Sequence, residues 1–469
     1  MMEQSKFDTL QGIQTIGELP TRNSIATLFT EMDFYQATQL YLWGLPLVTF
    51  AEWQRIHEEE FGATSGDLVT YVGYEDLAGI ITANATTPYT MGFIDLAKTG
   101  PMVIEIPKGH IAGGFSDFWQ REVAAVGEMG PDKGQGGKYI LLPPGMDDSE
   151  VYAAQGYHQI HSKMMNAFFG LRTLDPDPNV CKALVEEVKI YPYAKKDTIP
   201  PTRILSPAGK KYFAGPPKGI LYWERLQSMI AREMVEDRDR IFAQWLDNLG
   251  VRKNVFDPTP RQVAILRAAV EKGELMAQSN SFAKRIAGAR HWEDKHWDYV
   301  MIIPASSQRG ENFDYFFERT SYFYEAVTYS KAMISKTPNV GQAYLGTYTD
   351  SDENWLDGSK NYTLRIPANP PAVNFWSITV YDSATRCLIQ NEQKNADISS
   401  RKAIEVNADG SVDIYFGPEA PVGHESNWVQ TNRDAHWFTY LRLYGPTEQY
   451  FDKSWKMGDI EMMRTAVTM

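Results

Sequence analysis

Hydrophobic and polar positions change their spacing twice along the chain. Short apolar runs bounded by turn residues fill the early and late parts of the sequence, and such runs predict β-strands. Over 220–249 and 260–290, apolar residues recur every three or four positions with charges between them, which predicts helices. Gly250 is expected to end the first of these helices, because glycine readily takes the left-handed conformation that follows a helix.

Another helix is expected over 33–61, with Asp33 as its N-cap. The strands expected in the first β unit are 68–74, 92–95, 102–106, 115–126 and 139–142. Those expected in the second are 343–349, 362–366, 374–381, 403–407, 412–416 and 437–444. Many short strands with close turns favour a sandwich. Asp409-Gly410 predicts a tight hairpin turn, because this pair readily supplies positive φ angles.

The length of 469 residues is too great for one simple core, since domains usually hold about 100–200 residues. The predicted fold class is multidomain and mainly β, with an N-terminal β-sandwich, a central all-α unit and a C-terminal jelly roll. The expected divisions are a surface segment, a sandwich with its leading helix, a mostly helical subdomain with connectors, and a jelly roll, at 1–32, 33–190, 191–330 and 331–469.

The charge and composition of the chain limit the kinds of partner and the cellular location that are expected. The formal net charge of −13 repels phosphate backbones, so no nucleic-acid partner is expected. No run of 18 apolar residues exists, so a soluble protein without a membrane span is expected. The first residues contain no apolar segment of the signal-peptide kind, which predicts a cytoplasmic location for the chain as written. A periplasmic or secreted location is expected instead if a signal peptide was removed. The oligomeric state stays open, and a homo-oligomer is compatible with the sequence.

Several signatures of known chemistry are missing from the sequence. It contains no Gly-x-Ser-x-Gly elbow, no dinucleotide-binding glycine loop, no Walker-type phosphate loop and no His-Glu-x-x-His zinc pair. Its two cysteines are too few for a thiolate cluster. His158 and His161 could share one face of a helix, but no third ligand lies near them in the sequence. No cofactor and no metal are therefore expected.

Two parts of the chain resemble known families. The late part resembles DUF1214 in the order and spacing of 361–366, 370–382, 407–411, Asn427-Trp428, 441–446 and Trp455. The early part is similar to DUF1254 in 42–47, 84–89 and 136–145. The resemblance implies a sandwich, a helical subdomain and a jelly roll, and it implies no activity, because both names denote unknown function. The chain departs from the DUF1254 pattern at Thr86, where members commonly carry Asp; a possible acid, base or metal ligand is thus absent.

The segment 84–89 is the first candidate for a site. Asn84, Thr87 and Tyr89 offer uncharged donors and acceptors in a polar loop, which could orient a neutral or carbonyl ligand. The alternative is a loop whose polar side chains satisfy their own backbone. Tyr89 is an acid/base candidate, while Asn84 and Thr87 are candidates for binding.

Asp117 and His424 are the other acid/base candidates. Asp117 shares a predicted strand face with Trp119 and Arg121, so it is either a general acid with a raised pKa or, as we favour, half of a structural Asp–Arg pair. His424 lies in a glycine-bearing loop beside Glu425 and acts there as an acid or base, or is simply solvated.

Four residues of the second β unit are candidates for substrate binding. Trp376 and Tyr381 lie on opposite faces of one predicted strand, and one of these faces is expected to line a cavity, with core packing as the alternative for both aromatic residues. Trp428 follows the loop that holds His424. Arg442 could hold a carboxylate through two parallel hydrogen bonds, or form an internal salt bridge.

These residues lead to one principal hypothesis and two alternatives. The first is a cofactor-independent enzyme, hydrolase-like or lyase-like, that acts on a small, largely apolar organic molecule in a pocket between the β units. The second is a small-molecule-binding protein without chemistry. The third is a scaffold or assembly protein, which would need a large exposed apolar face.

Overall fold

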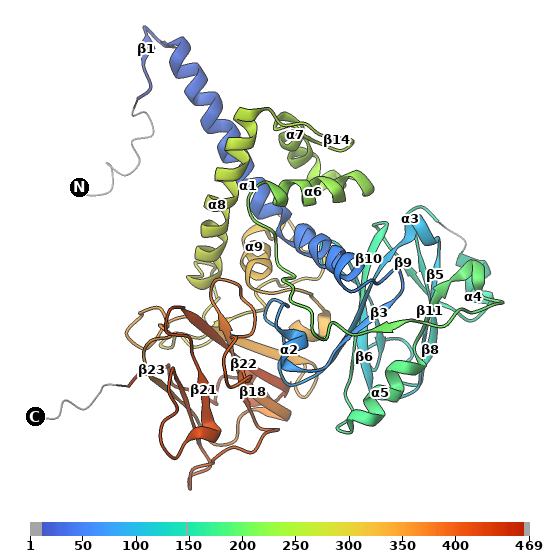
Figure 1. The fold of residues 1–469 in the computed structure, drawn as a ribbon, viewed down its shortest axis with the longest axis vertical. Helices are drawn as coiled ribbons and strands as arrows, with labels where there is room; N and C mark the ends of the chain where they lie inside the picture. The colour runs from blue at the N-terminus through green and yellow to red at the C-terminus, as the bar shows by residue number, and fades with distance from the viewer. Residues whose placement is uncertain (1–11, 147–148, 464–469) are drawn as a thin grey trace, which may run out of the picture. The chain divides into compact units, whose positions relative to one another are not determined.

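The computed structural model describes residues 12–146 and 149–463, and the chain divides into two compact units (Figure 1). Unit 1 combines Met1–Leu45 with Pro217–Ala277, and unit 2 combines Pro46–Pro216 with Gln278–Met469. Each predicted domain was one continuous stretch of sequence. Unit 1 instead combines the start of the chain with its middle, because residues of the first helix pack on the central helices. The architecture is multidomain and mainly β, as the sequence predicted.

Unit 1 is helical apart from two short hairpins. Its elements are β1 (Thr15–Ile16), β2 (Leu19–Pro20), the first part of α1 (Arg22–Arg55), α6 (Ile220–Arg232), η4 (Asp237–Asp239), α7 (Arg240–Asn248), β13 (Val251–Arg252), β14 (Val255–Phe256) and most of α8 (Pro260–Phe282). The Tyr222 ring lies 4.5 Å from that of Tyr41, and its hydroxyl donates to the Tyr41 carbonyl oxygen at 2.6 Å. The single helix expected over 220–249 is divided into α6 and α7, while Gly250, with φ of 77°, follows α7 as the predicted helix stop.

Helix α1 begins earlier than the sequence pattern indicated. The expected N-cap was Asp33, but the Thr21 hydroxyl accepts a hydrogen bond from the Ser24 N–H at 3.2 Å, so Thr21 caps the helix. The boundary between the two units falls within this helix, where unit 2 begins at Pro46. Proline has no backbone N–H, so Pro46 cannot donate a helical hydrogen bond. The helix ends in a π-helical turn, η2 (Ile56–Glu60).

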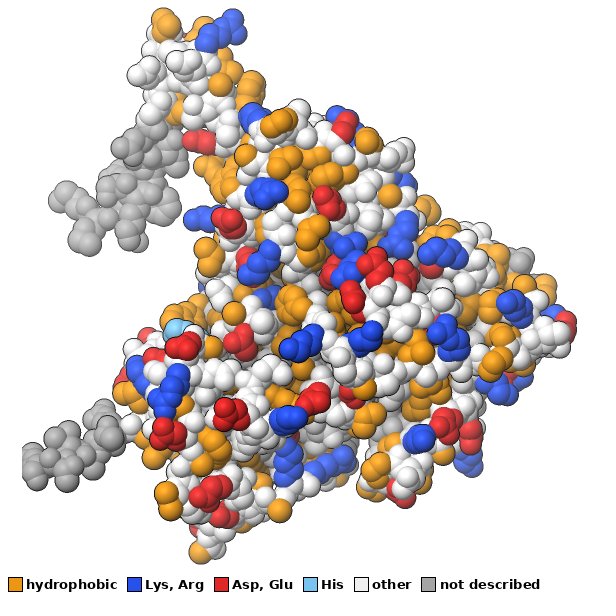
Figure 2. Space-filling model, viewed as in Figure 1, with side chains coloured by type: hydrophobic (Ala, Val, Ile, Leu, Met, Phe, Trp, Pro, Cys, Tyr) orange, Lys and Arg blue, Asp and Glu red, His pale blue; other side chains and the backbone are white. Residues whose placement is uncertain are grey.

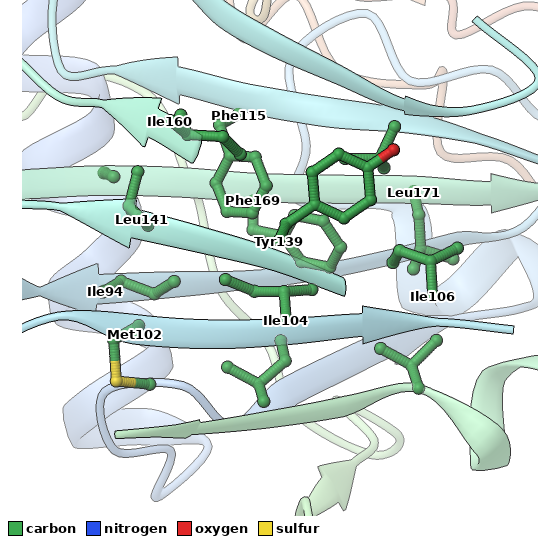
Figure 3. Packing of buried hydrophobic residues seen from close by; sticks show 14 of the residues in the cluster. Ile94, Met102, Ile104, Ile106, Phe115, Tyr139, Leu141, Ile160, Phe169 and Leu171 are labelled. Carbon is green, nitrogen blue, oxygen red and sulfur yellow. The ribbon is translucent and has the colours of Figure 1, made fainter. Parts of the chain in front are cut away.

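The first sandwich of unit 2 has one sheet in the order β12-β3-β4-β10-β6-β7 and another in the order β11-β5-β8-β9. Its strands are β3 (Leu68–Tyr71), β4 (Tyr89–Asp95), β5 (Met102–Ile106), β6 (Ile111–Asp117), β7 (Glu122–Gly127), β8 (Gly137–Leu142), β9 (His158–His161), β10 (Asn166–Thr173), β11 (Lys189–Pro192) and β12 (Ile204–Leu205). The connecting helices are α2 (Tyr74–Leu77), α3 (Leu96–Thr99), α4 (Ser149–Ala154), α5 (Pro178–Glu187) and η3 (Tyr193–Lys195). Figure 3 shows the core between the sheets, where Phe169 packs on Phe115 with ring centroids 4.8 Å apart.

Three local predictions for the first sandwich were wrong. The expected strand 115–126 is two strands, because the chain turns at Gln120, whose φ is 59°. His158 and His161 lie on β9 and not on a helix, so an i, i+3 spacing sends their side chains to opposite faces. Strand β10 was not predicted, since its near-continuous apolar run reads equally well as a helix.

The second sandwich has sheets in the orders β15-β16-β22-β18-β19 and β21-β20-β17-β23. Its strands are β15 (Asp298–Tyr299), β16 (Gln342–Thr347), β17 (Tyr362–Ile366), β18 (Ala372–Asp382), β19 (Asp397–Ser399), β20 (Val412–Gly417), β21 (Trp428–Gln430), β22 (Trp437–Pro446) and β23 (Glu461–Met462). The helices of this part are α9 (Phe316–Glu325), η5 (Lys331–Ile334), η6 (Glu425–Asn427) and α10 (Glu448–Phe451). Gly410 adopts φ of 83° in the predicted hairpin turn, whereas the expected strand 403–407 is irregular.

Acidic and basic side chains are interspersed over the face of the molecule shown in Figure 2. Within the described residues, no helix combines the length and the apolar character needed to cross a membrane.

Candidate functional site

Strand β22, the central strand of the larger sheet in the second sandwich, carries several of the polar side chains of the site. Tyr440, Arg442 and Tyr444 alternate along β22 and therefore share one face of the sheet. Tyr344 on β16 is paired with Arg442 in the strand register, and Ser377 on β18 is its partner on the other side. The sheet thus presents a buried guanidinium surrounded by tyrosines.

The guanidinium of Arg442 is buried without a counter-ion. Its Nη2 donates to the Thr82 carbonyl oxygen at 2.7 Å and to the Tyr381 hydroxyl at 2.6 Å. The centre of the guanidinium lies 5.0 Å from the Tyr344 ring centroid and 5.6 Å from that of Tyr440, within cation–π range. Nε is buried and has no hydrogen-bond partner, and among the described residues no carboxylate forms an ion pair with this side chain. Arginine keeps its charge in proteins, so the positive charge remains uncompensated.

Tyr381 bridges the two sandwiches at this point. Its hydroxyl accepts from Arg442 and donates to the Ala83 carbonyl oxygen at 2.9 Å. Burial raises the pKa of Tyr381 to about 12, although the charge of Arg442 opposes this effect. The phenol therefore stays neutral at physiological pH and acts as a fixed polar link.

A second guanidinium, that of Arg172 at the end of β10, approaches the same region from the first sandwich. It donates from Nη2 to the Tyr89 hydroxyl at 3.0 Å and from Nη1 to the Thr87 hydroxyl at 3.0 Å. A longer bond of 3.3 Å joins Nη1 to the Tyr444 hydroxyl. The guanidinium lies over the Tyr89 ring, 4.3 Å from its centroid. No ion pair between Arg172 and a carboxylate is found in the described parts of the chain.

The loop before β4 is held by Asn84, which is fully buried. Its side-chain nitrogen donates to the Thr87 hydroxyl at 3.0 Å and to the Tyr444 hydroxyl, and its side-chain oxygen accepts from the Thr86 N–H at 2.8 Å. The Asn84 N–H donates to the Tyr89 hydroxyl at 2.8 Å. Asn84 therefore connects residues within the loop by hydrogen bonds and also connects the loop to the second sandwich through Tyr444.

These groups surround a cavity of about 40 Å³ within unit 2, enough for a few water molecules. The lining residues are Trp53, Ile80, Ile81, Thr82, Ala83, Tyr89, Met91, Arg172, Val300, Met301, Tyr322, Ala326, Val327, Thr328, Met333, Tyr344, Tyr440 and Arg442. One part of this lining is cationic and phenolic, and the rest is mostly aliphatic or thioether, together with the indole of Trp53 and the side chains of Thr82 and Thr328. Arg442 Nε is buried without a hydrogen-bond partner, whereas the Tyr440 hydroxyl lies next to the Glu325 carboxylate and opposes the rise of its pKa.

A buried ion pair adjoins the cavity through Glu325, which precedes the lining residue Ala326. The side chains of Lys284 and Glu325 are both fully buried, with 3.1 Å between Nζ and Oε1. Lys284 Nζ also donates to the Tyr348 hydroxyl at 2.7 Å, and that hydroxyl donates to Glu325 at 2.5 Å. Burial raises the pKa of Glu325, and Lys284 opposes this increase. Because Lys284, Tyr348 and Tyr440 all interact with its carboxylate, Glu325 already has its own partners.

The sequence candidates divide between this site and other places. Five of them converge: Tyr89 and Arg442 line the cavity, while Asn84, Thr87 and Tyr381 hold the lining groups. Asp117 is buried in an ion pair with Arg121, at 2.7 Å, as the structural alternative expected. His424 is exposed and lies 3.0 Å from Glu405. Neither of these two candidates lines the cavity.

Trp376 and Trp428 also lie outside the lining. Trp376 is buried on the opposite face of β18 from Tyr381, as the alternation predicted. Trp428 is half-buried, and its ring N–H donates to the Gly417 carbonyl oxygen at 2.9 Å. Their assignment to substrate binding stays a prediction.

Sequence reasoning missed Arg172 and most of the tyrosines. Arg172 was missed because β10 was not predicted. Tyr440 and Tyr444 carry a usable signal, since they flank Arg442 at intervals of two on one strand. Tyr322 and Tyr344 give no such signal, because only the tertiary fold brings α9 and β16 to the cavity.

The fold and the site define a protein with two β-sandwiches, a helical unit and a buried cavity lined by arginine and tyrosine. Two family models match parts of this chain: the model described as "Protein of unknown function (DUF1254)" matches residues 68–192, and that described as "Protein of unknown function (DUF1214)" matches residues 341–448. The resemblance seen in the sequence is thereby confirmed. A comparison with curated proteins gives no match.

Two solved structures are similar in fold. The VPA0106 protein from Vibrio parahaemolyticus has a TM-score of 0.56 at 16% identity, over 92% of this chain and 100% of the other. A putative uncharacterized protein from Burkholderia cenocepacia has a TM-score of 0.42 at 10% identity, over 93% of this chain and 96% of the other. The first similarity supports the shared fold and says nothing about activity.

Proposed function

We propose that this chain binds a small organic anion, whose carboxylate is held beside Arg442 and Arg172. The observation that carries this proposal is a buried guanidinium without a counter-ion that faces a cavity. Removing a charged side chain from water costs several kcal/mol, even after the protein relaxes. Cation–π contacts and two carbonyl or hydroxyl partners offset part of that cost, whereas the Nε of Arg442 stays unsatisfied. An anionic ligand would compensate the charge and supply the missing acceptor.

The remaining lining suits the apolar part of such a ligand. Ile81, Met91, Val300, Met301 and Val327 offer aliphatic and thioether surface. Small-molecule sites commonly combine an apolar wall with a few polar groups that fix orientation. The ligand class that fits is therefore a small, largely apolar molecule with one anionic group.

A cofactor-independent enzyme, hydrolase-like or lyase-like, is the second candidate, and the hydrogen bonds of Tyr89 favour it. The Tyr89 hydroxyl accepts from the Asn84 N–H at 2.8 Å and from Arg172 at 3.0 Å. Because both acceptor positions are occupied, its own proton is left to donate, and Tyr89 lines the cavity. A hydroxyl held in this way is a candidate general acid.

The binding proposal is tested by isothermal titration calorimetry with butyrate and benzoate on the full chain. We expect Arg442→Met to weaken binding at least tenfold, because charge-assisted hydrogen bonds contribute about 1.5–3 kcal/mol. The matched control is Arg365→Met, since Arg365 lies on β17 and its side chain is 56% exposed. The proposal is refuted if neither carboxylate binds, or if both variants bind like wild type.

The catalytic candidate is tested by incubating the protein with a mixture of small carboxylates and following their consumption by mass spectrometry. We expect Tyr89→Phe to retain binding and to lose turnover, because only the acidic proton is removed. A wild type that binds carboxylates and consumes none of them would leave the binding function without catalysis.

A further inference from the structure

The cavity approaches solvent on one side, where its lining is formed by residues that are only half-buried. These residues are Tyr89, Arg172, Met301, Val327, Thr328 and Met333. The other lining residues are buried. Three of the half-buried residues belong to the segment 327–334, which follows α9 and ends with η5. This segment therefore covers part of the mouth of the cavity.

Side chains, and not a strand ladder, hold the backbone of segment 327–334. The Thr328 N–H donates to the side-chain oxygen of Gln120 at 2.7 Å, and the Lys331 N–H donates to the Glu122 carboxylate. The Thr328 carbonyl oxygen accepts from the Tyr322 hydroxyl at 2.6 Å. Within the described parts of the chain, no hydrogen bond joins the backbone of this segment to the backbone of another segment. Segments attached in this way are those that open locally while the rest of the fold stays intact.

A second irregular part of the lining is attached more firmly. The Thr82 N–H donates to the Arg386 carbonyl oxygen at 2.7 Å, and the Thr82 carbonyl oxygen accepts from Arg442. Beside Met301, the backbone of Val300 is bonded to strand β16. Segment 327–334 is therefore the part of the mouth that moves with the fewest backbone hydrogen bonds broken.

The closed position of this segment balances strain against contacts. Thr328 has φ of 63°, in the left-handed region that a β-branched residue rarely adopts. Its partner Gln120 is fully buried and has φ of 59°. Strained residues persist only where their neighbours hold them, and they are frequent at ligand clamps and switch regions. The buried ring of Tyr329, whose hydroxyl donates to the Ile303 carbonyl oxygen at 3.1 Å, favours the closed position. The hydrogen bond between Gln120 and Thr328 thus holds two strained backbones, and both can relax when it breaks.

From this arrangement we infer that residues 327–334 form a lid, which opens to admit the ligand and is kept closed by the hydrogen bond between Gln120 and Thr328. The cavity holds only a few water molecules, whereas a carboxylate with an apolar part is several times larger than one water molecule. Such a ligand enters only if part of the lining moves, and lids of this kind are common at ligand sites. The inference rests on the proposed anion binding for the identity of the ligand, but the opening itself is a property of the protein without ligand.

The opening is measured by the reaction of a thiol placed inside the cavity. Val300 lines the cavity, is 2% exposed and is similar in size to cysteine, so Val300→Cys introduces the reporter. The full chain is treated with N-ethylmaleimide, and the modification of each cysteine is followed by peptide mass spectrometry. Cys387 is buried outside the lining and serves as the internal control. We expect the introduced thiol to react roughly tenfold faster than Cys387 or more, because opening of the lid exposes the first and only wider unfolding exposes the second.

Two changes in the Val300→Cys background should shift this rate in opposite directions. Gln120→Met removes the acceptor of the Thr328 N–H and should speed the reaction about fivefold, the equivalent of one hydrogen bond. Thr328→Gly should slow it about fivefold, because glycine adopts a positive φ without strain and the closed lid is then stabilised. Asn369→Gly is the matched control: Asn369 is exposed, has φ of 55° and lies outside the lid, so the rate should not change.

The rate at Cys387 shows whether a variant has loosened the whole of unit 2, because Gln120 also donates to the Pro46 carbonyl oxygen. The inference is overturned if the introduced thiol reacts no faster than Cys387, if neither variant changes its rate, or if Thr328→Gly speeds the reaction as Gln120→Met does. If the rates shift as expected but butyrate and benzoate fail to bind, the lid stands and the proposed function falls.

Discussion

The buried histidine His291 gives a prediction whose size can be calculated. Its ring is 1% exposed and stacks on Tyr450 with centroids 4.9 Å apart, and both ring nitrogens lack hydrogen-bond partners. Burial, aided by the charge of Lys453, lowers the pKa of His291 from 6.5 to about 4. The neutral imidazole is therefore held in an apolar, aromatic environment.

We expect His291→Phe to stabilise unit 2, and to do so more strongly at pH 5 than at pH 7. At pH 7 the gain should be about 1–3 kcal/mol, since a buried polar group without partners is removed and the ring is kept. A depressed histidine pKa contributes stability that is fully present above about pH 6.5 and is lost as the pH falls towards 4, because the unfolded chain takes up the proton first. Between pH 7 and pH 5 this loss is about 2 kcal/mol, since each unit of pKa difference corresponds to about 1.4 kcal/mol.

The assay is urea denaturation at pH 7 and pH 5, read by pulse-labelling hydrogen exchange on peptides from β16 and β22, so that the transition belongs to unit 2. His57 is also buried, and burial lowers its pKa to about 3, so the variant should keep part of the pH dependence. His110→Phe is the control at pH 7: its side chain is 71% exposed, and a change within about 0.5 kcal/mol is expected. The reasoning is refuted if His291→Phe destabilises unit 2 at pH 7, or if it loses as much stability as wild type on acidification.

Two further predictions concern stability. Lys284→Met should lower the free energy of unfolding of unit 2 by about 3–5 kcal/mol, because the Glu325 carboxylate is left buried without its ion-pair partner. The double variant Lys284→Met/Glu325→Leu should recover more than half of this loss in urea denaturation. A double variant that recovers none of it would contradict the argument. Gly358→Ala should lower the midpoint of thermal unfolding by several degrees, because a Cβ atom there would collide with the Asn432 carbonyl oxygen. Gly458→Ala is the control and should leave the midpoint nearly unchanged, because nothing lies within 4 Å of a Cβ atom at that position. Equal midpoints for the two variants in calorimetry would contradict the predicted collision.

The sequence by itself predicted the multidomain, mainly β fold class and much of the local structure. Turn chemistry and periodicity are local properties, so Gly250 and the Asp409-Gly410 hairpin could be identified without tertiary information. The same holds for the alternation along β18, which separated Trp376 from Tyr381. The motif 84–89 and Arg442 were recognisable as candidates, because polar groups in a loop and a charge within an apolar strand stand out in a sequence.

Only the tertiary structure decided which of these residues meet. Strand β10 and with it Arg172 were not predicted, because an apolar run buried on both sides has no periodicity of its own. The tyrosines of α9, β16 and β22 come together at one cavity although more than a hundred residues separate Tyr322 from Tyr440. Whether a charged side chain has a counter-ion depends on its neighbours in space. The sequence therefore left Arg442 open between a ligand contact and an internal salt bridge, and its surroundings of tyrosines and carbonyl oxygens became visible only in the fold.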